Sequence, residues 1–218
     1  MSINELEKTP ELTIFYLARH GQSETNALSA KGEQQDPSLW HGSDLTSLGV
    51  NQALTLSNEL ENTNFAAIFS SDATRAKRTA QIVATNRDIV VTASDRIRET
   101  SAGNLHQVYL NPESDWAKIF TELPNSEKKL FKFTDDMESF HEASTRFLVF
   151  IHELTQIYSG SSVLIVSHGA LMKALLMEID YATFDELSKG SIENTAYFVL
   201  ENNDGNLLVR ETHGIHKK

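Results

Sequence analysis

Two histidines, two arginines and one glutamate, far apart along the chain, have side chains suited to phosphoryl-transfer chemistry. Arg19 and His20 stand together, Arg75 follows a run of small polar residues, and Glu99 and His168 come later. Together they offer a nucleophile, an acid and several cationic or proton-donating groups. This set is sufficient for transfer of a phosphoryl group through histidine without a metal ion. We therefore expect no metal site and no cofactor.

The two histidines and two arginines have different expected roles in attack on phosphorus and in binding the phosphoryl oxygens. A neutral imidazole attacks phosphorus well when one ring nitrogen is held as N–H, so that the other keeps its lone pair, and we assign this role to His20. Guanidinium groups bind phosphoryl oxygens in bidentate fashion, which suits Arg19 and Arg75. His168, if protonated, adds a further donor.

Glu99 is the expected proton donor to the departing alcohol. The negative charge of a bound phosphate favours the protonated carboxyl, which then serves as the base when water attacks phosphohistidine. The amide of Gly169, at the start of a predicted helix, is expected to bind phosphate as well.

Short apolar runs predict the elements that must position these residues. The predicted strands are 13–18, 66–69, 89–92 and 163–166, followed by a hairpin of 196–200 and 207–210. Helices are predicted from Thr46 or Ser47 to Leu60, after a cap within Ser70–Asp72, over 138–158 and over 170–177. The residues between 21 and 37 are predicted to form a polar loop.

Strands that alternate with helices predict a three-layer α/β/α sandwich with a mainly parallel central sheet. Such sheets bind ligands beyond the carboxyl ends of their strands. Arg19, His20, Glu99 and His168 follow predicted strands, and Arg75 lies early on a helix that follows one. We therefore expect all five at one edge of the sheet.

One domain accounts for the chain. Its 218 residues, 40% of them hydrophobic, suffice for one sizeable core. We expect residues 1–12 to form a flexible N-terminal tail, 13–212 the domain and 213–218 a C-terminal tail. Residues 103–136 contain Pro112 and Pro124 and lack clear periodicity, so we expect an excursion with short helices that covers the substrate.

Composition limits the partners. A net charge of −11 repels nucleic acids and anionic membranes, so we expect a small phosphate ester as partner, bound by a local cluster of cations for which Arg78 is a further candidate. The chain has no cysteine, which excludes disulfides and thiolate sites. No membrane-length apolar run and no secretory signal are found, which favours the cytoplasm. Oligomeric state cannot be inferred from these features.

Six motifs occur together in a specific order. They are Arg19–Asn26 (RHGQSETN), Gly42–Thr46 with Gly49, Ser70–Ala80, Arg98–Glu99, Met137–Ser139 and Ser167–Gly169. This series, within about Thr13–Leu200, resembles the histidine phosphatase superfamily, the phosphoglycerate mutase-like group, branch 1. The resemblance implies a phosphoglycerate mutase-like fold, phosphorylation of His20 and proton donation by Glu99.

The resemblance also implies a phosphate pocket of Arg19, Arg75 and His168, lined by Asn26 and the Gly42 loop. The chain departs from the family at 100–106 and 26–41, where the substrate is selected. We therefore favour a phosphatase that hydrolyses a phosphomonoester. A phosphoglycerate mutase-type phosphoryl transferase and a non-catalytic phospho-ligand or protein-binding module remain alternatives.

Overall fold

The computed structural model describes residues 12–33, 39–103, 115–203 and 205–218, so most of the predicted N-terminal tail and part of the 103–136 excursion lie outside the described residues. A six-stranded sheet with the order β3-β2-β4-β1-β5-β6 forms the middle layer. Its strands are β1 (Thr13–Arg19), β2 (Phe65–Ser71), β3 (Val91–Ser94), β4 (Ser162–Ser167), β5 (Ile192–Asn203) and β6 (Asn206–Ile215). Strands β1 to β4 are parallel to one another, whereas β5 pairs antiparallel with both β1 and β6.

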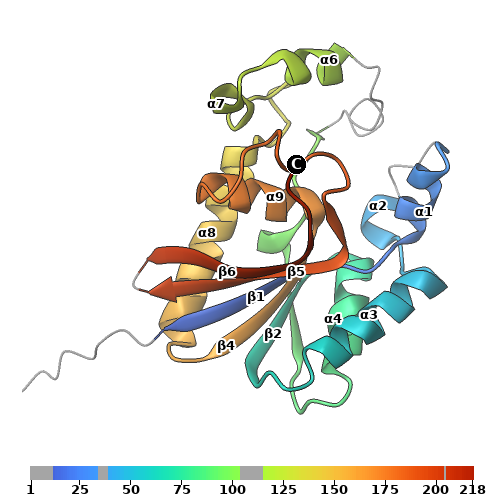
Figure 1. Cartoon of the computed structure of the whole chain (residues 1–218). Coiled ribbons are helices and arrows are strands. Elements are labelled where there is room, and N and C mark those ends of the chain that lie inside the picture. Colours follow the sequence, from blue (N-terminus) through green and yellow to red (C-terminus); the bar gives the residue numbers. More distant parts are fainter. Residues whose placement is uncertain (1–11, 34–38, 104–114, 204) are drawn as a thin grey trace, which may run out of the picture.

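Helices cover both faces of the sheet, which confirms the predicted three-layer architecture (Figure 1). The helices are α1 (Glu24–Ala30), α2 (Leu39–Gly42), α3 (Ser47–Glu59), α4 (Thr74–Ala84), α6 (Asp115–Glu122), α7 (Asn125–Lys128), α8 (Phe140–Ile157) and α9 (Gly169–Glu178), with a short 3-10 turn at Asp95–Ile97. No helix in the described ranges is long and apolar enough to span a membrane.

Strand β1 shows how the sequence divides the core between these faces. Phe15 and Leu17 are buried with α8 and α9, whereas Ala18 points to the opposite face, toward α3 and α4. Because side chains alternate along a strand, this pattern fixes the orientation of β1. The backbone of β1 pairs with β4 up to Arg19 and Ser167, so the residues that follow both strands emerge side by side.

Three predicted details are wrong. The stretch after His20 contains helix α1, whose capping box of Ser23 and Asn26 was not recognised in the sequence. Helix α4 begins after Ala73, a residue without a capping side chain, and the Ser71 hydroxyl accepts from the Ala73 N–H at 3.3 Å and binds His168. The hairpin is also much longer than predicted.

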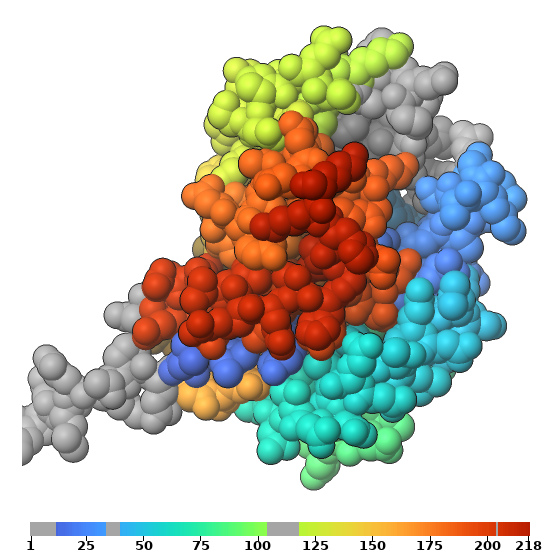
Figure 2. Space-filling view, in the orientation of Figure 1, coloured from blue at the N-terminus to red at the C-terminus, as the bar shows by residue number. Residues whose placement is uncertain are grey.

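The end of the chain is ordered rather than frayed. Strand β6 continues to Ile215, which pairs with Ile192, and the His216 N–H donates to the Ser191 carbonyl at 2.8 Å. Figure 2 shows this dark red segment lying on the orange segment that precedes β5. The C-terminus therefore packs against the chain that leads into β5.

Two glycines allow the loop after β1 to pack directly against the start of α3. A Cβ atom on Gly21 would lie 2.4 Å from the Gly49 carbonyl oxygen, and one on Gly49 would lie 2.0 Å from the Gln22 carbonyl oxygen. The Thr46 N–H donates to the same Gln22 carbonyl at 3.0 Å. This contact fixes the backbone that follows His20.

We predict that Gly49→Ala lowers the free energy of unfolding by at least about 2 kcal/mol, because backbone atoms must separate to admit the methyl group. Denaturant titration measures the change. Gly42→Ala is the matched control, since a Cβ there meets nothing within 4 Å, and it should change stability by less than about 0.5 kcal/mol. Equal stability of the Gly49→Ala protein and the wild type would contradict the tight contact.

Candidate active site

His20 leaves the end of β1 with its ring held in one orientation. Its backbone N–H donates to the Ser167 carbonyl at 3.0 Å, and the ring is buried, with 3% exposure. Its Nδ1 lies 2.7 Å from the Gly21 carbonyl oxygen, which can only accept, so Nδ1 carries the proton. Nε2 is left with a lone pair.

Arg75 donates to both histidine rings. Its Nε donates to His20 Nε2 at 3.1 Å, its Nη2 lies 3.2 Å from His168 Nδ1, and its Nη1 donates to the Trp40 carbonyl. A guanidinium group has no acceptor, so both ring nitrogens must be unprotonated acceptors. Burial lowers the pKa of Arg75 to about 10, with Glu99 acting in the opposite direction, so the guanidinium remains charged at neutral pH.

His168 is therefore neutral in this arrangement, in contrast to the protonated form considered from the sequence. With Nδ1 accepting from Arg75, its proton lies on Nε2, which donates to the Ser71 hydroxyl at 2.8 Å. Burial and the nearby guanidinium groups lower the pKa of both His168 and His20 well below 6.5. The two ring centroids are 5.1 Å apart.

Arg19 lies against the first residue of α9. Its Nη1 donates to the Ile192 carbonyl at 2.6 Å, while its buried Nε has no hydrogen-bond partner among the described residues. A Cβ atom on Gly169 would lie 3.3 Å from that Nε, so a glycine there leaves room for the guanidinium. Burial lowers the pKa of Arg19, and the charge of Glu99 partly offsets this effect.

Glu99 caps the start of α9. Its carboxylate oxygens accept from the backbone N–H groups of Thr100 at 3.0 Å, Leu171 at 2.9 Å and Ala170 at 3.2 Å. The two amides that follow Gly169 in this helix therefore bind a carboxylate. The same contacts fix Glu99 beside the arginine pair.

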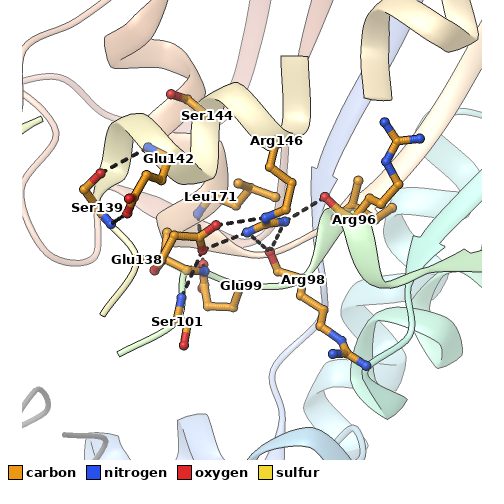
Figure 3. Close-up of polar contacts among 12 residues, drawn as sticks. Arg96, Arg98, Glu99, Ser101, Glu138, Ser139, Glu142, Ser144, Arg146 and Leu171 are labelled. Atoms are coloured by element: carbon orange, nitrogen blue, oxygen red, sulfur yellow. Dashed lines mark hydrogen bonds and ion pairs between the residues drawn. The ribbon is translucent and has the colours of Figure 1, made fainter. Parts of the chain in front are cut away.

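An ion pair between Arg146 of α8 and Glu138, which precedes that helix, holds the segment that carries Glu99 (Figure 3). Arg146 binds Glu138 through two hydrogen bonds of 2.9 Å and donates to the Arg96 carbonyl at 2.7 Å. Glu138 in turn accepts from the Ser101 N–H at 3.2 Å. The chain is thus held on both sides of Glu99.

Asn194 is a neighbour of His20 that sequence reasoning missed. Its amide donates to the His20 carbonyl at 3.1 Å and to Asn26 Oδ1 at 3.2 Å. The next residue, Thr195, has a positive φ of 60°, which is rare for a β-branched residue. No signal in the sequence marks this backbone conformation.

Two cavities open beside these residues and share Trp40, Glu99 and Thr100. The smaller one, of about 300 Å³, is lined by Arg75, His168 and Ser71, among others. The larger one, of about 480 Å³, is lined by Arg19, Asn26 and Gly169, together with residues of α6, α8, α9 and the chain before β5. His20 is not among the described residues that line either cavity, and Arg75 covers its Nε2.

The structure thus brings together five of the predicted site residues: Arg19, His20, Arg75, Glu99 and His168. Asn26 and Gly169 join them at the larger cavity. Gly42 is exposed at the end of α2 and lines neither cavity, and Arg78 is exposed on α4. Across the described residues, no group of three or more histidine, aspartate or glutamate side chains is placed to hold a metal ion.

We predict that the buried neutral histidines make stability depend on pH below about 6.5. There the unfolded chain takes up protons that the folded rings cannot, so the free energy of unfolding falls with pH by up to about 1.4 kcal/mol per unit for each ring. Denaturation at several pH values from 6.5 downward measures this slope. The slope should persist in His152→Asn, which changes an exposed histidine and serves as the control, and it should become shallower in His168→Asn. An unchanged slope in His168→Asn would contradict a buried, neutral His168.

This chain is similar to known proteins in sequence. Residues 15–213 match the profile of the histidine phosphatase superfamily, branch 1. The metal-independent phosphoserine phosphatase of Arabidopsis thaliana is 26% identical over 208 residues, with 91% of this chain and 80% of the relative covered. A probable phosphoglycerate mutase, GpmB of Salmonella arizonae, is 30% identical over 168 residues, with 75% and 73% covered.

The fold is also shared with a solved structure. The crystal structure of phosphoglycerate mutase from Bacillus anthracis superimposes with a TM-score of 0.75 at 22% identity, covering 95% of each chain. The profile match spans most of the sequence, including every residue of the site described above. The chain belongs to branch 1 of the histidine phosphatase superfamily.

Proposed function

We propose that this protein is a metal-independent phosphatase that hydrolyses a small phosphomonoester through a phosphohistidine on His20. The observation that carries the proposal is the orientation of one ring, whose Nδ1–H is held by the Gly21 carbonyl while the Nε2 lone pair faces Arg75. A binding protein has no need of an imidazole held as a nucleophile.

In the first step, His20 Nε2 forms a bond to phosphorus while the bond from phosphorus to the ester oxygen breaks. Arg75 must move its Nε away from Nε2 and turn toward the phosphoryl oxygens, which replace its present partners. Arg19 has an unpaired Nε for the same oxygens. Two guanidinium groups thereby stabilise the charge that develops on the phosphoryl group.

Glu99 supplies the proton that the leaving alcohol needs. Three backbone N–H groups hold its carboxyl group in place, and the charge of a bound phosphate favours the protonated acid that the step requires. In the second step, water attacks the phosphohistidine, Glu99 takes its proton, and inorganic phosphate leaves with His20 neutral again. One carboxyl group thus serves as acid and then as base.

A mutase is the second candidate, because the matched relatives include one named as a probable phosphoglycerate mutase. A mutase transfers the phosphoryl group from His20 to a second alcohol instead of to water. A requirement for a bisphosphorylated primer distinguishes this reaction from hydrolysis. We favour hydrolysis because the chain departs from the family at 26–41 and 100–106.

We predict that His20→Ala abolishes the activity and the covalent intermediate together, whereas Glu99→Gln lowers kcat about 10²- to 10⁴-fold and still forms some phosphoenzyme. A panel of phosphate esters, assayed with and without chelator, measures turnover, and acid-labile label on quenched protein measures the intermediate. His152→Ala is the control, because it changes an exposed histidine of α8. Turnover by His20→Ala would exclude the mechanism. Loss of wild-type turnover when chelator is added would also exclude it.

We also predict that Arg146→Met lowers kcat about tenfold by loosening the segment around Glu99. Because Glu99 protonates the leaving group, the loss should be larger for alkyl phosphates than for 4-nitrophenyl phosphate, whose leaving group needs little protonation. Arg96→Met is a suitable control, since Arg96 forms an exposed ion pair with Glu153. Equal losses for both esters would indicate general destabilisation and contradict a role in positioning Glu99.

A further inference from the structure

The larger cavity contains a buried lysine that the proposed chemistry does not use. Lys173 lies on α9, one helical turn after Ala170, whose N–H binds Glu99. It is only 9% exposed and lines the same cavity as Arg19 and Glu99. An ester with its phosphoryl group at Arg19 would extend its alcohol part along this wall.

Aromatic rings line the cavity wall beside the lysine. Phe120 of α6, Phe140 of α8 and Phe184 meet in this wall, with centroids 4.6 Å apart for Phe120 and Phe184 and 5.5 Å apart for Phe140 and Phe184. The Lys173 Nζ lies 3.1 Å from the centroid of Phe184. A ring face attracts the cation but neutralises no charge.

Hydrogen bonding leaves this ammonium group short of partners. Within the described residues, Lys173 Nζ donates to the Leu187 carbonyl, although an ammonium group has three N–H donors. The carboxylate that acts on it, Asp185, is held by Lys128 Nζ at 2.8 Å and by Asn125 Nδ2 at 2.9 Å. Lys173 therefore lies buried without a carboxylate in direct contact.

Burial disfavours the charged form of the Lys173 amine. Burial lowers the pKa of Lys173 to about 7, with Lys128 contributing in the same direction and Asp185 opposing it. A carboxylate in contact with the amine would supply the missing counter-charge and favour the charged form. The site is thus suited to an anion that arrives with the ligand.

Charge in the rest of the cavity favours the same kind of ligand. Among the described lining residues, Arg19, Lys173 and Lys189 are cationic, and Glu99 is the single acid. The whole chain carries a net charge of −11, so this cavity is locally opposite in sign. Since Arg19 serves the phosphoryl group and Lys189 is exposed, Lys173 is the buried cation that remains for the alcohol part.

We propose that the larger cavity binds the alcohol part of the ester, that this part carries a carboxylate, and that Lys173 binds that carboxylate. The proposal rests on the phosphatase function proposed above and narrows its substrate class. A carboxylate fits better than a second phosphate, because one buried ammonium among aromatic rings balances one negative charge, whereas a dianion needs more donors.

Calorimetric binding to His20→Ala, which cannot form the intermediate, tests the proposal. The ligands are alkyl phosphates of two to four carbons, the same chains ending in a carboxylate, and the corresponding bisphosphates. At neutral pH, at least one carboxylate ester should bind about tenfold or more tightly than its alkyl match and more tightly than the bisphosphate. Equal affinities of all the matched pairs, or preference for the bisphosphate, would overturn the proposal without any change at Lys173.

Adding Lys173→Met should reduce the preference for the carboxylate to less than about threefold, while Lys173→Arg should retain part of it. Lys77→Met, on α4 and outside the cavity, should leave the preference unchanged. A carboxylate preference that survives Lys173→Met in a folded protein would exclude this lysine.

Turnover by the wild-type protein separates this inference from the proposed function. Hydrolysis of the alkyl phosphates without any carboxylate preference in binding would overturn the lysine site alone. Tighter binding of carboxylate esters without hydrolysis of any ester would overturn the phosphatase and leave the lysine site in place.

Discussion

A single guanidinium group, donating to two imidazole rings, determines the chemistry of this site. Arg75 offers only N–H donors, so the nitrogens of His20 and His168 that face it must both be lone pairs. The opposite nitrogens then carry protons, which the Gly21 carbonyl and the Ser71 hydroxyl accept. The result is a neutral His20 imidazole with a defined tautomer, which is the form that the proposed mechanism requires.

The fold is arranged to support that contact. Parallel pairing of β1 with β4 places the two histidines side by side, and the helix after β2 brings Arg75 between them. The close contact of Gly21 with Gly49 fixes the backbone carbonyl that holds the His20 proton. Residues from β1, β2, β4 and α4, or directly after them, are thus held in one buried hydrogen-bond network of His20, Arg75, His168 and Ser71.

Charge balance links this network to the two cavities. Arg19 and Arg75 are buried together, and Glu99 is the acid that partly offsets the lowered pKa of each. A phosphoryl group would complete the balance at one end of the larger cavity, and a carboxylate near Lys173 would do so at the other. The protein therefore offers two separate cationic positions in a strongly acidic chain.

Local sequence patterns predicted the sheet and the convergence of the five site residues well, because short apolar runs mark buried strands and parallel strands end at one edge. They failed where a tertiary contact overrides a local preference. A cap was expected within Ser70–Asp72, but α4 begins after Ala73, and the Ser71 hydroxyl binds His168. The Gly169 amide was expected to bind phosphate, and the Glu99 carboxylate binds the two amides that follow it. The hydrogen bonds of Asn194 and the cavity position of Lys173 depend on residues far away in the sequence, such as His20 and Arg19.

The most direct test of the central claim is the protonation of the His20 ring, observed by nitrogen NMR on protein with ¹⁵N-labelled histidine near pH 7. The account predicts a neutral ring protonated at Nδ1 with an unprotonated Nε2, and the opposite tautomer for His168. A charged imidazolium at position 20, or a proton on its Nε2, would contradict it.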